Sequence, residues 1–403
     1  MPTTKPVITA EISRRKFLRM GGKGLLVAGF AGSLAACGRH SSPETETVIR
    51  VPKGFVPRIV ARTGYRSSSK SSYLWHQSPA GGACFATGDH GWIYVSNCES
   101  GADYRNVSAL RFDSNGVIIG SYPVLTGGRE KRSGGPTPWG TWLACEEIPD
   151  GQVWECDPFA VNPPKAFPGL GLFRHQSACV NPLTWQIYMT EDEDGGCLYR
   201  FTPQDALAVA APDLELGILE VATEVGSRVV WEPIPDPLAK TNPLRLQISG
   251  STRFAGGGGI DLYDHFVRFS TKFDNHVWEL DLSNKSLRTK YNLTGQINDV
   301  DDLTHTASGN ILVAEDGAYM RVLYLFADGS PALTLLQLPE HPHSEITGLA
   351  FEPSGTRLYF SSQRGNTGDD TNGITFELKG DFSSLGPSSR LETWVLDHRK
   401  IAN

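Results

Sequence analysis

One short strand-like pattern occurs six times along the 403-residue chain and constrains its fold more than any other feature. Each copy is a run of aliphatic and aromatic residues that ends in polar or acidic residues. The copies start at Trp92, Thr141, Gln186, Phe266, Asn310 and Arg357. By subtraction, successive starts are 49, 45, 80, 44 and 47 residues apart. A regular period of this size is typical of stacked or radial repeats, and four-stranded propeller blades repeat at about 40–45 residues.

Short alternating runs bounded by turn sequences favour an all-β fold. The 43 Gly and 26 Pro residues suit many turns. We expect a single β-propeller domain over residues 55–400. The long interval between repeats three and four holds a Pro-rich stretch, 233–243, which we interpret as an insertion. If the blades form a ring, equivalent strand ends meet near the axis, and six remote stretches become one site.

The N-terminal residues have the pattern of an export signal. Arg14 and Arg15 precede a short apolar run over 24–36, as in twin-arginine signals, and this run is too short to span a bilayer. The segment Leu34–Cys37 resembles a bacterial lipoprotein box, which implies cleavage before Cys37 and lipidation of its sulfur. Cleavage near Ala36 without a lipid is one alternative. A basic N-terminus followed by a core helix is the other.

We therefore expect a twin-arginine lipoprotein signal over 1–37 and a flexible tether over 38–54. The mature protein would be periplasmic and held at the outer membrane, because Gly38 gives no inner-membrane retention signal, or it would be secreted to the cell surface. Its only membrane contact would be the lipid. A net charge of −7 without a basic block argues against nucleic-acid binding. We expect a monomer.

Two cysteines flank the turn sequence 149–152. A two-residue Asp-Gly hairpin would place Cys145 opposite Cys156, which permits a disulfide. Cys145 also precedes two glutamates, so a thiolate metal ligand is equally open. A buried, inert thiol is the third interpretation.

Aligned repeats place carboxylates in two adjacent columns. The first column contains Asn97, Glu146, Glu191, Thr271, Glu315 and Ser362, and the second contains Cys98, Glu147, Asp192, Lys272, Asp316 and Gln363. Neighbours in a strand point to opposite faces, so one residue of each pair can face a shared site. Converging carboxylates repel unless a cation lies between them, and their oxygens suit calcium or magnesium. Solvated loop charges are the alternative, also for the cluster of Asp299, Asp301 and Asp302.

Two basic residues are candidate partners for an anion. Arg174 lies shortly before the third repeat, and Lys272 ends the fourth. A guanidinium matches phosphate geometry well, so both are candidate catalytic residues, with ordinary surface charge as the alternative. The sequence has no Gly-x-Ser-x-Gly motif, which disfavours a serine hydrolase.

The stretch 133–147, Ser-Gly-Gly-Pro-Thr-Pro-Trp-Gly-Thr-Trp-Leu-Ala-Cys-Glu-Glu, resembles the signature of the PhoX-type alkaline phosphatases. Further similar segments follow in order, namely 173–175, 188–193, 199–201, 269–272, 277–278, 313–317 and 347–355. The resemblance extends from about residue 60 to about residue 363. It implies a six-bladed propeller and a phosphomonoesterase whose site near the axis holds ferric iron and calcium.

Carried over by motif, the resemblance implies Cys145 as an iron ligand. The implied metal ligands among the acidic residues are Glu146 or Glu147, Glu191, Asp192, Glu193, Glu315 and Asp316. Asp302, in the acidic cluster before the fifth repeat, is a further candidate metal ligand. The chain departs from the family at several ligand-like positions, where it has Ala80, Cys98, Gln176 and Gly258.

Two classes of function follow. The first is a metal-dependent phosphohydrolase in the cell envelope that acts on a phosphorylated small molecule, with activity altered or reduced by these departures. The second is a lipid-anchored propeller that binds a ligand or protein partner without catalysis.

Overall fold

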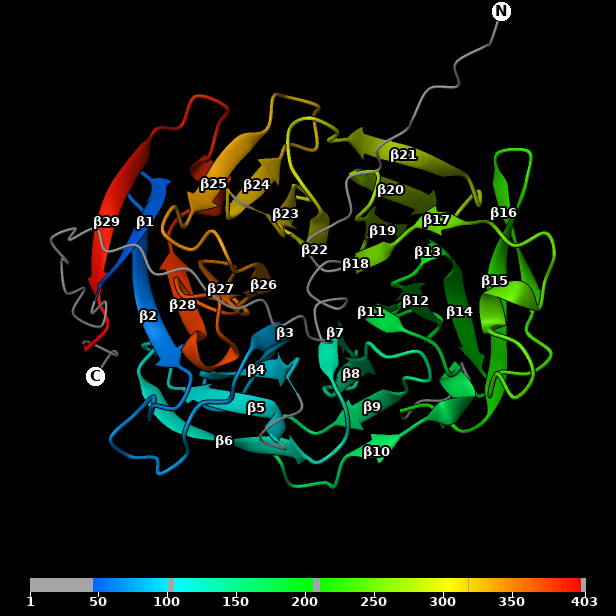
Figure 1. The fold of residues 1–403 in the computed structure, drawn as a ribbon, viewed down its shortest axis with the longest axis horizontal. Coiled ribbons are helices and arrows are strands. Elements are labelled where there is room, and N and C mark those ends of the chain that lie inside the picture. The colour runs from blue at the N-terminus through cyan, green and yellow to red at the C-terminus, as the bar shows by residue number, and fades with distance from the viewer. Residues whose placement is uncertain (1–45, 101–104, 206–210, 318, 400–403) are drawn as a thin grey trace, which may run out of the picture. The chain divides into compact units, whose positions relative to one another are not determined.

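Six antiparallel β-sheets lie around a common axis in the part of the chain that the computed structural model describes, residues 46–100, 105–205, 211–317 and 319–399 (Figure 1). The predicted six-bladed, all-β propeller is confirmed. The signal expected over 1–37 lies outside the described residues, as do the first eight residues of the expected tether. Among the described residues, no helix has the length and apolar character needed to cross a membrane.

We number the blades by their innermost strands. Blade 1 comprises β3 (Pro79–Ala86), β4 (Trp92–Cys98), β5 (Arg105–Phe112) and β6 (Ile118–Thr126). Blade 2 comprises β7 (Lys131–Pro136), β8 (Trp142–Glu146), β9 (Val153–Cys156) and β10 (Lys165–Ala166). Blade 3 has five strands, β11 (His175–Val180), β12 (Ile187–Glu191), β14 (Leu198–Pro203), β15 (Gly217–Val225) and β16 (Arg228–Pro233).

Blade 4 comprises β18 (Gly257–Tyr263), β19 (Phe266–Thr271), β20 (His276–Asp281) and β21 (Leu287–Asn292). Blade 5 contains β22 (Val300–His305), β23 (Ile311–Glu315), β24 (Arg321–Leu325), β25 (Leu333–Gln337), β1 (Glu46–Pro52) and β29 (Leu391–Asp397). Blade 6 contains β26 (Ile346–Phe351), β27 (Arg357–Ser362), β28 (Ile374–Lys379) and β2 (Val56–Arg62). The described residues also form the short 3₁₀ turns η2 (Pro168–Leu170), η3 (Leu244–Leu246), η4 (Asp370–Asn372) and η5 (Phe382–Ser384).

The six sequence repeats are the second strands of the six blades, β4, β8, β12, β19, β23 and β27. These strands are buried on both sides, because each blade packs against a neighbour on either face. In β8, for example, Trp142 packs toward blade 1 and Leu143 toward blade 3. Six apolar clusters result, one between each pair of adjacent blades. The alternating pattern therefore reflects the two faces of a buried strand.

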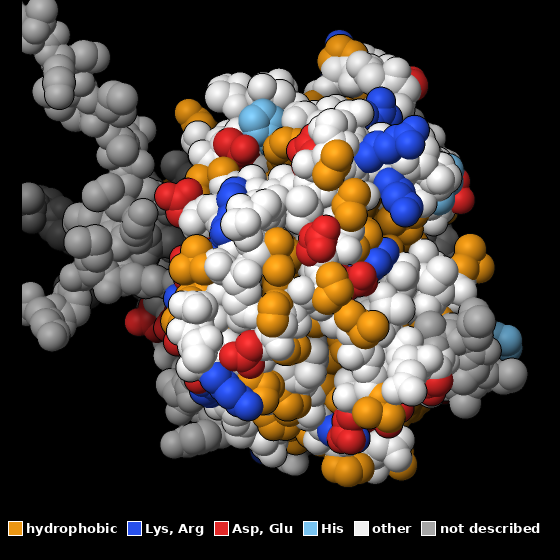
Figure 2. Space-filling model, turned by 90° about the vertical axis from the view of Figure 1, so that its right-hand side faces the viewer, with side chains coloured by type: hydrophobic (Ala, Val, Ile, Leu, Met, Phe, Trp, Pro, Cys, Tyr) orange, Lys and Arg blue, Asp and Glu red, His pale blue; other side chains and the backbone are white. Residues whose placement is uncertain are grey.

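The long interval between repeats three and four contains the additional strand β16, the turn η3 and a two-stranded pairing of β13 (Asp194–Gly196) with β17 (Phe254–Ala255). That this segment is an insertion stays a prediction. Along β15 and β16, the exposed apolar residues Ile218, Val225 and Val230 lie among charged ones such as Glu224 and Arg228. Figure 2 shows the side of the molecule that carries this blade, where apolar and charged side chains are interspersed.

The first two described strands, β1 and β2, pair with strands from the last part of the chain and so close the ring of blades. Strand β2 is the outermost strand of blade 6, and β1 lies between β25 and β29 in blade 5. The prediction of a tether up to residue 54 is therefore wrong from residue 46 onward. The reason is the alternating segment 46–52, in which Ile49 and Val51 are fully buried in the cluster between blades 5 and 6.

Candidate functional site

The innermost strand of every blade is irregular close to its first residue. Each one loses register with the second strand, at 79–82, 131–134, 175–177, 257–260, 300–303 and 347–350. Such bulges re-aim side chains that a regular ladder would hold in the sheet. Arg132, Gln176, Gly258 and Asp301 all lie at these bulges, and neighbouring first strands pack side by side around the axis. The bulges thus form a ring that directs polar groups into the centre.

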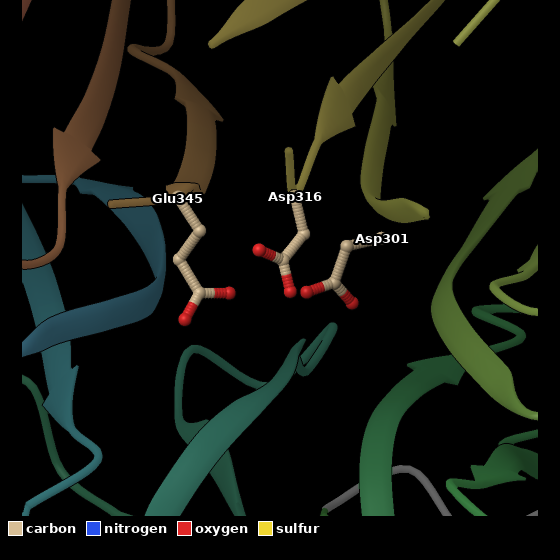
Figure 3. A group of neighbouring side chains, drawn as sticks. All are labelled: Asp301, Asp316 and Glu345. Carbon is tan, nitrogen blue, oxygen red and sulfur yellow. The ribbon is translucent and has the colours of Figure 1, made fainter. Parts of the chain in front are cut away.

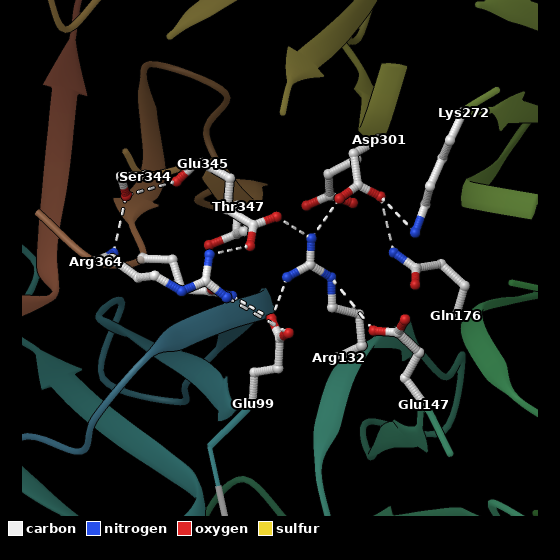
Figure 4. A network of polar contacts seen from close by, with 12 residues as sticks. Glu99, Arg132, Glu147, Gln176, Lys272, Asp301, Ser344, Glu345, Thr347 and Arg364 are labelled. Carbon is white, nitrogen blue, oxygen red and sulfur yellow. Dashed lines mark hydrogen bonds and ion pairs between the residues drawn. The ribbon is translucent and has the colours of Figure 1, made fainter. Parts of the chain in front are cut away.

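Arg132 occupies the middle of this ring. Its side chain is only 2% exposed, and its guanidinium forms ion pairs with Glu99, Asp301 and Glu345 (Figure 4). Its Nε atom also lies 3.8 Å from Oε2 of Glu147. These carboxylates come from blades 1, 5, 6 and 2, so one buried cation links four blades.

Two further cations flank Arg132. The Lys272 ammonium lies 3.0 Å from Oδ2 of Asp192 and 3.3 Å from Oδ1 of Asp301. On the other side, Arg364 Nη1 lies 2.8 Å from Oε1 of Glu345. Burial alone would lower the pKa of Arg364, but the adjacent carboxylates of Glu345 and Glu99 raise it.

Carboxylates outnumber cations in this axial cluster, which we define by its charged members: Arg132, Lys272, Arg364, Glu99, Glu147, Asp192, Asp301, Asp316 and Glu345. Asp301, Asp316 and Glu345 each offer an oxygen within 4.8 Å of the others and point toward one another (Figure 3). Six carboxylates against three cations leave an excess of three negative charges. Buried carboxylates in excess favour either protonation or a bound cation.

Two buried glutamine side chains complete the cluster. Gln176 Nε2 donates to Oδ1 of Asp301 at 2.9 Å, and Gln363 Nε2 donates to Glu99. Rotating either amide by 180° would place its oxygen against a carboxylate, so both orientations are determined. The amide oxygens of these two glutamines then have no hydrogen-bond donor among the described residues, although both side chains are buried.

The carboxylates of the first column lie elsewhere. Glu146 forms two ion pairs within blade 2: its Oε1 lies 2.8 Å from Nζ of Lys131, and its Oε2 lies 3.1 Å from Nη2 of Arg129. Glu191 forms an ion pair with Arg245, and Glu315 forms one with Arg321 in its own blade. The prediction that these three glutamates share one cation site is not supported by the structure. The physical reason is strand alternation: the second column, with Glu147, Asp192, Lys272, Asp316 and Gln363, faces the axis, and the first column therefore does not.

Different environments set the acidities of the first-column glutamates. Burial would raise the pKa of Glu146, but Lys131, the Gln152 N–H group and Arg129 together lower it. Burial raises the pKa of Glu191 more than Arg245 and the Tyr199 hydroxyl lower it. Both residues have the environment of structural ion pairs at the ends of second strands.

Arg174 and Glu193 lie beside the cluster and contact each other. Arg174 Nε donates to Oε1 of Glu193 at 3.1 Å, and its Nη1 donates to the backbone oxygen of Glu147 at 2.9 Å. Their side chains are partly exposed, 15% and 31% respectively. The predicted anion partner Arg174 is thus a rim residue that is paired with a predicted metal ligand, whereas Lys272 lies inside the cluster.

Cys145 and Cys156 face different blades. In β8 and β9, Cys145 is opposite Val153, and Cys156 is opposite Trp142. The predicted pairing of residues 145 and 156 is wrong, because the loop between these strands is longer than a two-residue hairpin. Cys145 packs in the apolar cluster between blades 2 and 3, and Cys156 in the one between blades 1 and 2. Both are free thiols, and burial raises the pKa of each.

Asp302 faces away from its neighbour Asp301. Its carboxylate accepts hydrogen bonds from the backbone N–H groups of Gly348 and Leu349, at the bulge of blade 6. It lines a cavity of about 470 Å³ whose other lining residues, such as Ser133 and Ala178, lie largely on innermost strands. Burial, and secondarily the charge of Asp301, raises the pKa of Asp302 to about 7. The predicted metal ligand Asp302 is therefore a cavity residue and not a member of the acidic triad.

Sequence reasoning missed Arg132, Glu99, Glu345 and Arg364. Arg132 and Glu345 lie on or next to innermost strands, whose bulges interrupt the period of two that revealed the second strands. Glu99 and Arg364 each follow a second-column residue directly, so extending the aligned columns by one position would have included them.

The resemblance to PhoX-type alkaline phosphatases was compared with protein-family models and with curated protein sequences. The family model described as alkaline phosphatase PhoX matches residues 118–261, from β6 to β18. The chain resembles the PhoX-type alkaline phosphatases. The expected resemblance is confirmed over this PhoX-like segment, which supplies Arg132, Glu147, Gln176 and Asp192 to the axial cluster. No curated protein sequence matches the chain.

Several solved structures are similar in fold. A protein proposed to be a gluconolactonase has 13% sequence identity and a TM-score of 0.45, with 82% of this chain and 94% of that chain covered. A luciferin-regenerating enzyme has 12% identity and a TM-score of 0.46, with 81% and 96% covered. The calcium-binding protein regucalcin from Agrobacterium tumefaciens has 13% identity and a TM-score of 0.42, with 83% and 98% covered.

Proposed function

We propose that this protein is a metal-dependent phosphohydrolase that acts on phosphate monoesters at the axial cluster. The observation that carries the proposal is the match of the PhoX family to residues 118–261, because this segment supplies four of the polar residues at the centre of the ring. The substrate we propose is a phosphorylated small molecule.

The donor set of the cluster fits a hard divalent cation. Asp301, Asp316 and Glu345 offer carboxylate oxygens that lie close together, and the cluster carries an excess of negative charge. Calcium prefers oxygen ligands of this kind. Bound there, such a cation would polarise a phosphate oxygen and compensate charge. We propose calcium as the cofactor.

The residues do not fit the thiolate-bound iron that the family resemblance implies. The Cys145 thiol is fully buried in an apolar cluster, and the carboxylate of the adjacent Glu146 is occupied by Lys131 and Arg129. We therefore assign no step of the reaction to iron.

The cationic side chains of the cluster would bind the phosphate group. Lys272 is 3% exposed and Arg364 is 24% exposed, so both are removed from most solvent screening. An arginine can hold two phosphate oxygens at once, and an ammonium group can stabilise negative charge that develops during phosphoryl transfer. The cavity of about 470 Å³ is lined by Ser133 and Asp302, the residues that follow Arg132 and Asp301 in the chain, and we propose that it holds the rest of a small substrate.

Hydrolysis of p-nitrophenyl phosphate with and without calcium tests the proposal. We expect turnover that requires calcium and that falls at least about 100-fold in Lys272→Met, as for loss of a group that stabilises charge in the transition state. Lys290→Met is the matched control, because Lys290 pairs with Glu279 at 3.6 Å in the outer part of blade 4. Lack of turnover by the folded, calcium-loaded wild-type protein would refute the phosphohydrolase.

One observation favours the second candidate, a propeller that binds a ligand without catalysis. The oxygens of Asp301 and Glu345 already accept from Arg132, Lys272 and Arg364, so the cluster is largely satisfied by internal ion pairs. This candidate predicts calorimetric binding of inorganic phosphate together with an absence of turnover.

We also propose that the protein is exported and lipid-anchored in the cell envelope, on the basis of Arg14, Arg15 and Cys37, and that it is a monomer. Labelling with radioactive palmitate followed by fractionation tests the anchor. We expect label in the membrane fraction for wild type and none for Cys37→Ser. Light scattering of the soluble domain tests the monomer.

A further inference from the structure

The Arg132 guanidinium holds the position at which the carboxylates of four blades converge. We propose that Arg132 is a built-in cation, which occupies a position that a divalent cation would otherwise fill, so that removal of its charge creates an additional calcium site. The inference rests on the proposed function in one respect only, namely that calcium is the cation the cluster accepts.

The first argument is the coordination that Arg132 has. Its partners Glu99, Asp301 and Glu345 come from separate blades and all point at the guanidinium (Figure 4). Glu345 is 1% exposed and Asp301 is 1% exposed, so water cannot screen their repulsion. Without a central positive charge, these groups would protonate or separate. A cation is thus required at this point, and Arg132 supplies it.

The second argument comes from two glutamines rather than from carboxylates. The amide oxygens of Gln176 and Gln363 are buried in the cluster and have no donor among the described residues. Their own NH₂ groups contact Asp301 and Glu99, which are two of the carboxylates bound by Arg132. A guanidinium has a planar set of donors in fixed directions, whereas calcium accepts six to eight oxygens from many directions, amide oxygens included. The unpartnered oxygens are therefore the ligands that a spherical cation could use and an arginine does not.

The test compares two neighbouring buried cations. Arg132→Met removes the charge at the axis while keeping a long apolar side chain. Lys131→Met removes a fully buried charge one residue earlier, whose partner Glu146 lies outside the cluster. Both variants lose one positive charge and one set of buried ion pairs. They differ in whether the carboxylates left behind belong to the axial cluster, which also holds the two glutamine amides.

Calcium binding by equilibrium dialysis and thermal unfolding with and without calcium are the two measurements. We expect Arg132→Met to bind one more calcium ion per chain than wild type, and to show a larger increase in Tm on calcium addition than wild type does, because a ligand of the folded state stabilises it. Lys131→Met should bind as many calcium ions as wild type, and calcium should not restore its stability.

Several outcomes would overturn the inference. These are an unchanged calcium stoichiometry in Arg132→Met, an equal gain in Lys131→Met, or failure of Arg132→Met to refold in calcium under conditions in which Lys131→Met refolds. Refolding of Arg132→Met in calcium but not in EGTA would support it. Phosphatase activity is measured separately on wild type. Absence of turnover by wild type, together with a gained calcium ion in Arg132→Met, would refute the proposed function and leave the inference intact.

Discussion

Glu315 and Asp316 are neighbours in the chain but belong to different electrostatic groups. Glu315 is paired with Arg321 at 2.9 Å inside blade 5, whereas Asp316 lies with Asp301 and Glu345 at the axis. The pair shows how one strand end supplies both a structural ion pair and a candidate ligand, because successive side chains point in opposite directions.

The substitutions Asp316→Asn and Glu315→Gln should therefore have different effects. We expect Asp316→Asn to weaken calcium binding about tenfold or more, since one of the three converging carboxylates is lost. Glu315→Gln should leave calcium affinity unchanged but lower the free energy of unfolding by about 2 kcal/mol, because a charged hydrogen-bonded partner of Arg321 is lost. Calorimetric calcium titration and urea unfolding of both variants check this. Equal calcium affinities in the two variants would contradict it.

Gly258 lies in the bulge of blade 4 and has no space for a side chain. A Cβ atom there would lie 2.2 Å from Oγ of Ser270 and 2.8 Å from the backbone oxygen of Asp301. We expect Gly258→Ala to destabilise the protein by about 1–3 kcal/mol through overpacking. Gly120 in β6 is the control, because the nearest atom to its Cβ position is 3.7 Å away. Urea denaturation should show Gly120→Ala to be neutral, and a neutral Gly258→Ala would mean that the bulge can relax.

Protonation of the buried His341 should lower the free energy of unfolding at acid pH. His341 is buried with Thr47, Ser362 and His398 around it, and burial, with the charge of His398 second, lowers its pKa to about 4. The unfolded chain binds this proton near pH 6.5, so the stabilising contribution is complete above that pH and is lost as the pH falls toward 4. A shift of this size corresponds to at most about 3 kcal/mol.

Unfolding free energies of wild type and His341→Gln, measured between pH 7 and pH 4, test this prediction. The difference between the two proteins should shrink or change sign as the pH falls, because the variant has no such proton to bind. His343→Gln, at an exposed position two residues later, is the control. Parallel pH profiles for wild type and His341→Gln would contradict the assignment.

Cys145 should be dispensable for calcium binding and turnover. Its thiol packs with apolar residues between blades 2 and 3, so Cys145→Ala should cost about 1 kcal/mol of stability from lost packing. Turnover should stay within about twofold of wild type. Thiol titration should find Cys145 unreactive until denaturant is added, in keeping with its burial. Loss of bound metal in Cys145→Ala would instead support Cys145 as the thiolate ligand that the family resemblance implies.

The sequence predicted the blades better than it predicted the site. Second strands such as β8 and β23 were found because both of their faces are buried, which makes their apolar runs regular. Innermost strands were harder to find, since a bulge follows Lys131 in β7 and Val300 in β22 and interrupts the alternation. The role of Arg132 depends on contacts with Glu99 and Glu345, which are 33 and 213 residues away in the chain. No local sequence pattern indicates such contacts. Asp316, in contrast, lies in a column that the aligned repeats show directly.

The pairing of β1 with β29 and of β2 with β28 affects the order of events during synthesis. The first two described strands complete sheets whose other members come from much later in the chain. Loss of β1 would separate β29 from β25 in blade 5, and loss of β2 would remove the outermost strand of blade 6. The ring of blades closes only when these distant segments have paired, which accords with the proposed transport of an already folded protein.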